Sequence, residues 1–327
     1  MNARSLGTHG PDVGAIALGC MGMSEFYEPV EEREAIRTIH RALELGMTLI
    51  DTSDMYGRGE NERLVGRALR DRRGRAVVAT KAGIVRTDDP SYRGVNGTPE
   101  YIRTACEASL ARLGVDRIDV YYLHRSDPNV PIEETIGAMA ELAAAGKVRY
   151  LGVSELSASA LRRAGNTAPI AALQSEYSLF TRDVESNGVL NAARELGIGL
   201  VAYAPLGRGM LTGAVRSTDG LTEGDLRRRV PRFDDGNLEH NLALVDALSA
   251  LAREVGCTPA QLALAWLLAR GDDVIALPGC ERVAHAEENA RAADVRLDEA
   301  MLARIEALFP PGAAAGARLR TSSAVTS

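Results

Sequence analysis

Four reactive side chains stand at or just after the ends of apolar segments in the first part of the chain. Asp51 ends the segment TLID, and Tyr56 follows it closely in the same motif, DTSDMYG. Lys81 ends AVVATK, and His124 ends IDVYYLH. Side chains at successive strand ends of an α/β fold can converge on one rim. Each of these residues alone is more often structural, but together they predict a site for acid–base chemistry.

The chemistry that suits this set is proton transfer to or from a carbonyl or hydroxyl group. A free phenol, with a pKa near ~10, is a poor proton donor at neutral pH unless a cation stabilises its phenolate. We expect Lys81 to supply that cation and Asp51 to keep Lys81 charged in a half-buried position. His124 can hydrogen-bond the substrate oxygen and orient it.

The elements that would position these residues alternate regularly. An Ala- and Leu-rich helical stretch, a glycine and a short apolar run recur, and Gly46, Gly114, Gly146 and Gly197 fit the left-handed residue that closes a helix. The apolar runs are continuous, which is typical of parallel strands covered on both faces. The predicted strands are Ala15 to Leu18, Thr48 to Asp51, Ala76 to Thr80, Ile118 to Leu123, Tyr150 to Val153, Ala171 to Gln174, Gly199 to Tyr203 and Val274 to Leu277.

Strands that alternate with helices in this way predict one α/β domain, a (β/α)8 TIM barrel over residues 1–309 with a short N-terminal β-hairpin. The main alternative is an open doubly wound sheet, but ALGCMGMS after the first strand lacks the expected G-x-G-x-x-G. The polar stretch 216–241 is expected to be an excursion between the seventh strand and its helix. Residues 310–327 are expected to form a flexible tail.

Composition and charge indicate which kinds of binding partner the protein is suited to. The chain has 327 residues, 46% of them hydrophobic and 25% charged, with a formal net charge of −6. No basic surface for nucleic acid or anionic membrane is indicated, and no leader or membrane span is seen, so a cytoplasmic protein is predicted. The cysteines lack metal-ligand spacing, so we expect structural thiols and no metal site. They are Cys20, Cys106, Cys257 and Cys280.

The chain also carries an ordered series of longer motifs: DTSDMYG, VVATKAG, IDVYYLHRSDP, KVRYLGVS, LQSEYSLF, VAYAPLGRGMLTG and EENARAADVRL. From about Leu6 to about Leu308 this series resembles the aldo-keto reductase superfamily. The PLGRG form, with RGVNGTPEYIR and VPRF, is most similar to the bacterial and plant branch described as auxin-induced-protein-like or perakine-reductase-like. The catalytic tetrad of the family falls on Asp51, Tyr56, Lys81 and His124.

The resemblance implies that an aldehyde or ketone is reduced by hydride from the nicotinamide C4 of NAD(P)H, with Tyr56 as general acid and no metal. It places the nicotinamide between the ends of the first seven strands, the pyrophosphate in the PLGRG loop and the adenosine after the eighth strand. The implied cofactor contacts are Gly22, Met23, Asp51, Ser154, Gln174, Tyr203, Pro205, Leu206, Gly207, Arg208, Gly279, Arg282, His285, Glu288 and Asn289.

Two residues depart from the family pattern. Glu281 stands where lysine is commoner, and Ala204 stands where serine is usual. A carboxylate beside the ribose 2′-phosphate is unfavourable, which leaves Arg282 and His285 to meet that group. We therefore expect NADPH to be preferred by a reduced margin, with NADH possible as a cofactor.

Two functions remain open. The leading one is a carbonyl reductase acting on a small or medium organic substrate, and the alternative is a nicotinamide-binding redox-sensing or regulatory subunit with slow turnover. The complete tetrad favours the enzyme. A metal- or phosphate-dependent barrel enzyme would need clusters of carboxylate and histidine ligands that the sequence lacks. The substrate depends on loops 83–97 and 216–233, and neither it nor the oligomeric state follows from the sequence.

Overall fold

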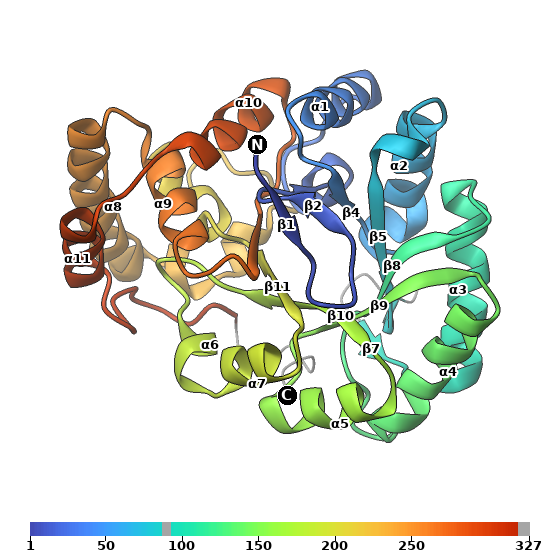
Figure 1. The fold of residues 1–327 in the computed structure, drawn as a ribbon. Coiled ribbons are helices and arrows are strands. Elements are labelled where there is room, and N and C mark those ends of the chain that lie inside the picture. Colours follow the sequence, from blue (N-terminus) through green and yellow to red (C-terminus); the bar gives the residue numbers. More distant parts are fainter. Residues whose placement is uncertain (87–92, 320–327) are drawn as a thin grey trace.

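The computed structural model describes residues 1–86 and 93–319. Within these residues, eight parallel strands form one sheet that is ringed by helices (Figure 1). In the order of the sheet, the strands are β3 (Leu18–Gly19), β4 (Leu49–Asp51), β5 (Val77–Ala82), β8 (Ile118–Leu123), β9 (Val148–Ser154), β10 (Ile170–Glu176), β11 (Gly199–Tyr203) and β12 (Val274–Leu277).

The sheet closes between its first and last strands. Parallel bridges join Ile16 to Ala276 and Gly19 to Gly279, and the backbone N–H of Gly19 donates to the carbonyl of Pro278 at 3.0 Å. The predicted (β/α)8 barrel is therefore confirmed. The first strand is shorter than predicted, because residues 15–17 pair with the last strand but not with β4.

Helices cover the outside of the barrel. Their ends follow local sequence: Thr258 and Gln261 form a capping box, and the predicted helix stop at Gly114 has φ +65°. The other three predicted stops also have positive φ. The helices are α1 (Glu32–Glu44), α2 (Glu60–Leu69), α3 (Pro99–Leu113), α4 (Ile132–Ala144), α5 (Ala158–Thr167), α6 (Asp183–Ser186), α7 (Val189–Glu195), α8 (Asp235–Val255), α9 (Pro259–Leu268), α10 (Val283–Arg291) and α11 (Glu299–Leu308). In the described parts of the chain, no helix is both long enough and apolar enough to cross a membrane.

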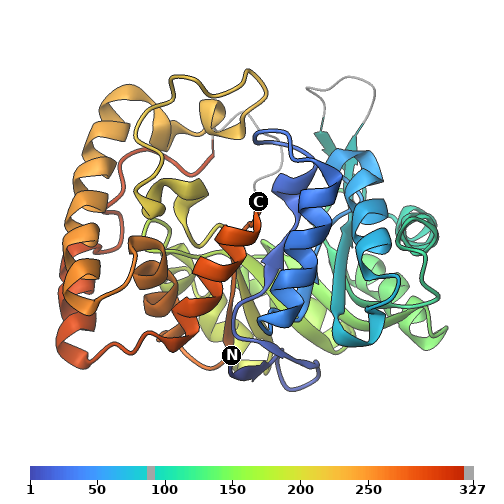
Figure 2. The same ribbon diagram turned by 90° about the horizontal axis from the view of Figure 1, so that it is seen from above.

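The two ends of the barrel differ. A hairpin of β1 (Ala3–Ser5) and β2 (Asp12–Gly14) covers the end where the strands begin, whereas the long loops rise from the end where the strands finish (Figure 2). A second hairpin, β6 (Ile84–Arg86) with β7 (Arg93–Val95), stands at that loop end. Residues 87–92 of the expected substrate loop 83–97 lie outside the described residues. Functional sites of such barrels form at the end where the strands finish, which is this loop end.

The predicted excursion 216–241 is shorter than expected. It holds two 3-10 turns, Leu226–Arg229 and Pro231–Phe233. From Asp235 onward it belongs to helix α8, and Asn241 lies on the buried face of that helix. Arg232 lies in the interior, although it belongs to this polar stretch. Its guanidinium donates to the hydroxyl of Thr181 at 2.7 Å and to the carbonyl of Phe180 at 2.8 Å.

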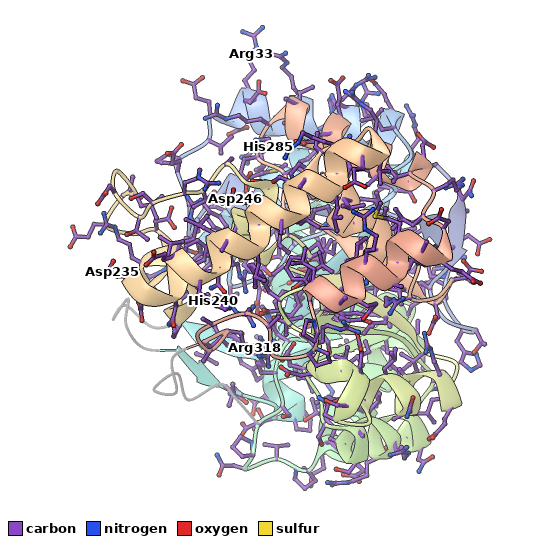
Figure 3. The ribbon with its side chains drawn as sticks, turned by 90° about the vertical axis from the view of Figure 1, so that its left-hand side faces the viewer. Arg33, Asp235, His240, Asp246, His285 and Arg318 are labelled. Atoms are coloured by element: carbon purple, nitrogen blue, oxygen red, sulfur yellow. The ribbon has the colours of Figure 1, made fainter. Side chains whose placement is uncertain are left out.

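Residues 310–319, the first part of the predicted flexible tail, make specific contacts. The amide of Asn241 donates to the carbonyl of Ala315 at 3.0 Å, and Arg318 donates to Glu155 at 2.5 Å. His240 of α8 bonds the carbonyl of Ala313 at 2.9 Å, and Figure 3 shows His240 and Arg318 on the same side of the molecule. These contacts hold the segment against α8 and the barrel rim. The rest of the predicted tail lies outside the described residues.

Candidate active site

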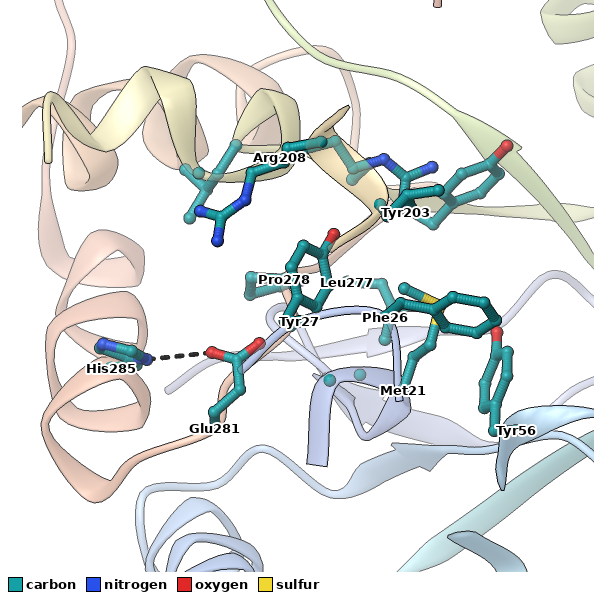
Figure 4. A pocket seen from close by; sticks show the side chains of 18 of the residues that line it. Met21, Phe26, Tyr27, Tyr56, Tyr203, Arg208, Leu277, Pro278, Glu281 and His285 are labelled. Atoms are coloured by element: carbon teal, nitrogen blue, oxygen red, sulfur yellow. Dashed lines mark hydrogen bonds and ion pairs between the residues drawn. The ribbon is translucent and has the colours of Figure 1, made fainter. Parts of the chain in front are cut away.

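A cavity of about 1410 Å³ opens at the loop end of the barrel. Tyr56 and Tyr203 line one part of it, and Glu281 and His285 line another, some distance away (Figure 4). The cavity joins the ends of strands from both halves of the chain, so residues far apart in the sequence line it. We call the part of the cavity around Tyr56 the catalytic end.

Lys81 joins Asp51 and Tyr56 beneath the floor of the cavity. Its ammonium donates to the Asp51 carboxylate, to the carbonyl of Thr52 at 2.8 Å and to the Tyr56 hydroxyl at 3.4 Å. Lys81 is fully buried, whereas Tyr56 is 8% exposed and reaches the cavity. The elements β4 and β5 thus hold a buried ion pair directly behind the phenol.

Burial and charge act against each other in this group. Burial tends to lower the pKa of Lys81, but Asp51 and Tyr56 together outweigh it, so the pKa is raised and the ammonium stays charged. Burial raises the pKa of Tyr56, and the charge on Lys81 offsets only part of that rise. Tyr56 is therefore a protonated phenol whose conjugate base has a fixed cation beside it.

His124 faces Tyr56 across the catalytic end. The two rings meet edge to face, with centroids 6.1 Å apart and an interplanar angle of 88°. Burial, together with the charges on Arg125 and Lys81, holds the pKa of His124 well below its usual range. The imidazole is neutral, and it can donate or accept a hydrogen bond at the cavity but carries no charge.

A chain of hydrogen bonds leads from His124 away from the cavity. The hydroxyl of Ser53 lies 3.2 Å from His124 Nδ1 and 3.2 Å from Asp54 Oδ1. Burial raises the pKa of Asp54 to about 7, and the charge on Glu62 adds to the rise. Sequence reasoning missed Ser53 and Asp54, although both lie inside the motif DTSDMYG.

The residues expected around the nicotinamide adjoin this centre. The Gln174 amide donates to the second oxygen of Asp51 at 2.8 Å, so it also supports the tetrad. The Ser154 hydroxyl accepts from Arg125 at 3.1 Å. Arg125, which the sequence analysis did not single out, lines the cavity directly after His124.

The PLGRG loop has an unusual backbone. Ala204, Gly207, Arg208 and Gly209 have φ of +48°, +58°, +60° and +90°. Within the loop, the backbone N–H groups of Gly207 and Gly209 donate to the carbonyls of Ala204 and Leu206, each at 3.0 Å, so Arg208 is the group that can meet an anion. The Arg208 guanidinium lies 5.6 Å from the centre of the Tyr203 ring. This loop can therefore meet an anionic group in the middle of the cavity.

The other end of the cavity, around Glu281, is more polar and more open. Glu281 accepts a hydrogen bond from His285 at 3.2 Å, which raises the pKa of His285 (Figure 4). A Cβ atom at Gly22 would lie 2.3 Å from a Glu281 oxygen, so a larger residue there would displace this carboxylate. Arg282 is 66% exposed and pairs loosely with Glu28 at 3.9 Å.

The structure brings nearly all of the predicted site residues to this cavity. Lys81 lies behind its wall, Met23 packs in the hydrophobic core while Met21 lines the cavity, and Gly207 faces Phe180. The predicted residues that line the cavity are Gly22, Asp51, Tyr56, His124, Ser154, Gln174, Tyr203, Pro205, Leu206, Arg208, Gly279, Arg282, His285, Glu288 and Asn289.

Comparisons with known proteins agree with this geometry. The model of the Aldo/keto reductase family matches residues 15–309. The NADP(+) aldo-keto reductase yakc of Schizosaccharomyces pombe is 44% identical over 315 residues, which cover 92% of this chain and 93% of that protein. The solved glycerol dehydrogenase AKR11B4 of Gluconobacter oxydans has a TM-score of 0.85 and 32% identity, over 94% of this chain and 96% of that one. An aldo/keto reductase from Klebsiella pneumoniae, in complex with NADP and acetate, has a TM-score of 0.75 and 29% identity, over 98% and 99%.

Proposed function

The chain belongs to the aldo/keto reductase family, and on this premise we propose that it reduces an aldehyde or ketone to an alcohol with NADPH, Tyr56 being the general acid. The observation that carries the proposal is the placement of the Tyr56 hydroxyl. It lies at the cavity, 3.4 Å from a buried ammonium that is itself paired with Asp51. Few arrangements other than proton donation explain a phenol held in this way.

The cavity suits a dinucleotide. Its length joins the catalytic end to the Glu281 end, and the left-handed loop with Arg208 lies between them. We assign Ser154, Gln174 and Tyr203 to the nicotinamide, the loop 205–208 to the pyrophosphate, and the adenosine to the residues after β12. Those last residues are Gly279, Arg282, His285, Glu288 and Asn289.

The chemistry divides among the residues of the catalytic end. A bound reduced nicotinamide would supply the hydride. Tyr56 gives its phenolic proton to the carbonyl oxygen, and Lys81 stabilises the phenolate that remains. Asp51 keeps Lys81 charged and in place. His124, being neutral, hydrogen-bonds the substrate oxygen and orients it between Tyr56 and the hydride donor.

NADPH is the cofactor we propose to be preferred. The relative in Schizosaccharomyces pombe is named with NADP(+), and the Klebsiella pneumoniae reductase was solved with NADP. The carboxylate of Glu281, at the end of the cavity assigned to the adenosine, is expected to narrow the margin over NADH.

The test is continuous turnover of neutral aldehydes. Purified protein is mixed with NADPH or NADH and a panel of uncharged aldehydes and ketones, and the absorbance of the reduced nicotinamide is followed. Many turnovers per chain, abolished in Tyr56→Phe, are expected. Oxidation of only one bound cofactor per chain would overturn the proposal and favour a redox-sensing subunit.

A further inference from the structure

Arg125 lies close enough to the reacting groups for its charge to lower the pKa of both Tyr56 and His124. It stands directly after His124, and one of its terminal nitrogens donates to the His124 carbonyl at 2.6 Å and to the Ser154 hydroxyl at 3.1 Å. The side chain is half-buried and lines the cavity beside Tyr56. Within the described residues, no hydrogen bond engages its other nitrogens.

No carboxylate in residues 1–86 or 93–319 forms an ion pair with Arg125. Glu155, an acid near enough for its pKa to be affected by Arg125, is already engaged: it accepts hydrogen bonds from Arg318 at 2.5 Å and from the backbone N–H of Glu176 at 2.9 Å. Burial and these hydrogen bonds fix Glu155 in place. In the part of the chain that the structure describes, Arg125 therefore has no carboxylate as a direct partner at the catalytic end.

Most other arginines of the cavity are neutralised. Arg227 pairs with Asp225 at 2.6 Å. Arg208 and Arg282 lie near carboxylates at 3.8 Å and 3.9 Å. Arg229 is a further lining arginine for which the described residues provide no ion pair, and it is exposed on the loop 216–233. Apart from Asp51, which is paired with Lys81, the acidic residues of the lining include Glu281 and Glu288 at the opposite end.

An uncompensated charge in a half-buried site is unfavourable, and binding an anion relieves it. The planar guanidinium matches a carboxylate, with which it forms short, charge-assisted hydrogen bonds. At the catalytic end that anion must come from the molecule whose carbonyl meets Tyr56 and His124. The cofactor phosphates are assigned elsewhere, along the loop 205–208 and beyond.

We propose that the substrate is an oxo acid, an aldehyde or ketone whose carboxylate is bound by Arg125. The inference rests on the proposed function and names the substrate class of the same site. Hydride from NADPH forms the new C–H bond at the carbonyl carbon, the C=O π bond opens, and the oxygen takes the proton of Tyr56, which solvent restores. The products are a hydroxy acid and NADP+, and the carboxylate is unchanged.

The experiment compares each acid with its own methyl ester, which removes the charge and keeps the carbonyl. Phenylglyoxylate and succinate semialdehyde place the carboxylate at two distances from the carbonyl. We expect wild-type kcat/KM to favour the acid over the ester about 10- to 100-fold for at least one of them, mainly through KM. Arg125→Gln keeps an amide donor for Ser154 and should erase that preference, whereas Arg125→Lys should retain part of it.

Arg229→Gln is the matched control, since it removes an equally unpaired arginine from the exposed mouth of the cavity. We expect it to leave the acid-to-ester ratio nearly unchanged. Equal rates for acid and ester in the wild type would overturn the inference, as would a ratio that depends on Arg229. A uniform loss on acids and esters in Arg125→Gln, or weaker NADPH binding by fluorescence titration, would show that Arg125 only positions Ser154 and His124. If neutral aldehydes are not reduced either, the proposed function itself has failed.

Discussion

The two ends of the cavity are built differently. At the catalytic end, Asp51 and Lys81 are almost fully buried, and each has several hydrogen-bond partners. At the opposite end, Arg282 is mostly exposed and Glu281 is paired with a histidine on the next helix. Buried charges depend strongly on their partners, whereas exposed ion pairs contribute little. The difference implies that changes at the catalytic end are severe and that the far end tolerates substitution.

The largest effect is expected for Tyr56→Phe, because it removes the proton donor and leaves the surrounding packing intact. Carbonyl reduction should fall by about 10² to 10⁴ or more. NADPH affinity, measured by fluorescence titration, should stay close to that of the wild type. A variant that retains half of the wild-type rate with chemistry rate-limiting would mean that Tyr56 is not the acid.

Lys81→Met is expected to come next. Since the Lys81 charge lowers the pKa of Tyr56 against the effect of burial, its loss should raise that pKa and reduce the rate about 10²-fold. The basic limb of the pH profile, recorded with a slow, chemistry-limited substrate, should move to higher pH. Asp51→Asn should also reduce the rate, but more weakly, because it loosens Lys81 without removing the cation. An unmoved basic limb in Lys81→Met would contradict the electrostatic role, and thermal unfolding checks that each variant is folded.

The hydrogen-bond chain behind His124 predicts a smaller, pH-dependent effect. Below pH of about 7, neutral Asp54 can donate to Ser53, so that Ser53 donates to Nδ1 and the imidazole proton stays on Nε2, toward the cavity. Above a pH of about 7, ionised Asp54 accepts the hydroxyl proton of Ser53. Ser53 then accepts from the imidazole, so the imidazole proton lies on Nδ1. We expect the rate of the chemical step to fall as pH rises through about 7, and Asp54→Asn to remove this fall.

The pH dependence of the unfolding temperature gives an independent test of the raised pKa of Asp54. The pKa of Asp54 is raised from its ordinary 3.8 to about 7 in the folded protein, so its contribution to stability is fully present below about 3.8 and is lost as pH rises through about 7. Asp54→Asn should therefore flatten the pH dependence of the unfolding temperature in this range. Asp71→Asn, at an exposed position, is the control and should change neither profile.

The smallest effects are expected at the far end. Glu281→Lys should tighten NADPH binding and leave NADH almost unchanged, because only NADPH carries the 2′-phosphate. Arg282→Ala should weaken NADPH binding by no more than about fivefold, since the side chain is 66% exposed. Dissociation constants for both cofactors decide this, with Glu281→Gln as the neutral, isosteric control. Equal effects on NADH and NADPH would place the segment away from the 2′-phosphate.

Much of the architecture was predictable from the sequence. Continuous apolar runs and helix-closing glycines identified all the barrel strands to within a few residues, and the family inferred from the motifs is confirmed. The auxin-induced-protein-like branch and the cytoplasmic location stay predictions. Asp51, Lys81 and His124 were recognisable because a reactive residue at a strand end has few places to point in a parallel barrel.

What the sequence by itself determined was local: which segments become strands, where helices stop, and which reactive side chains end on the same rim. The tertiary structure decided the rest. It linked Asp54 through Ser53 to His124, gave Arg125 no carboxylate partner among the described residues, turned Arg232 inward and held residues 310–319 against α8. Charge pairing and burial depend on which distant segments meet, and segments far apart in the chain meet only when the barrel closes.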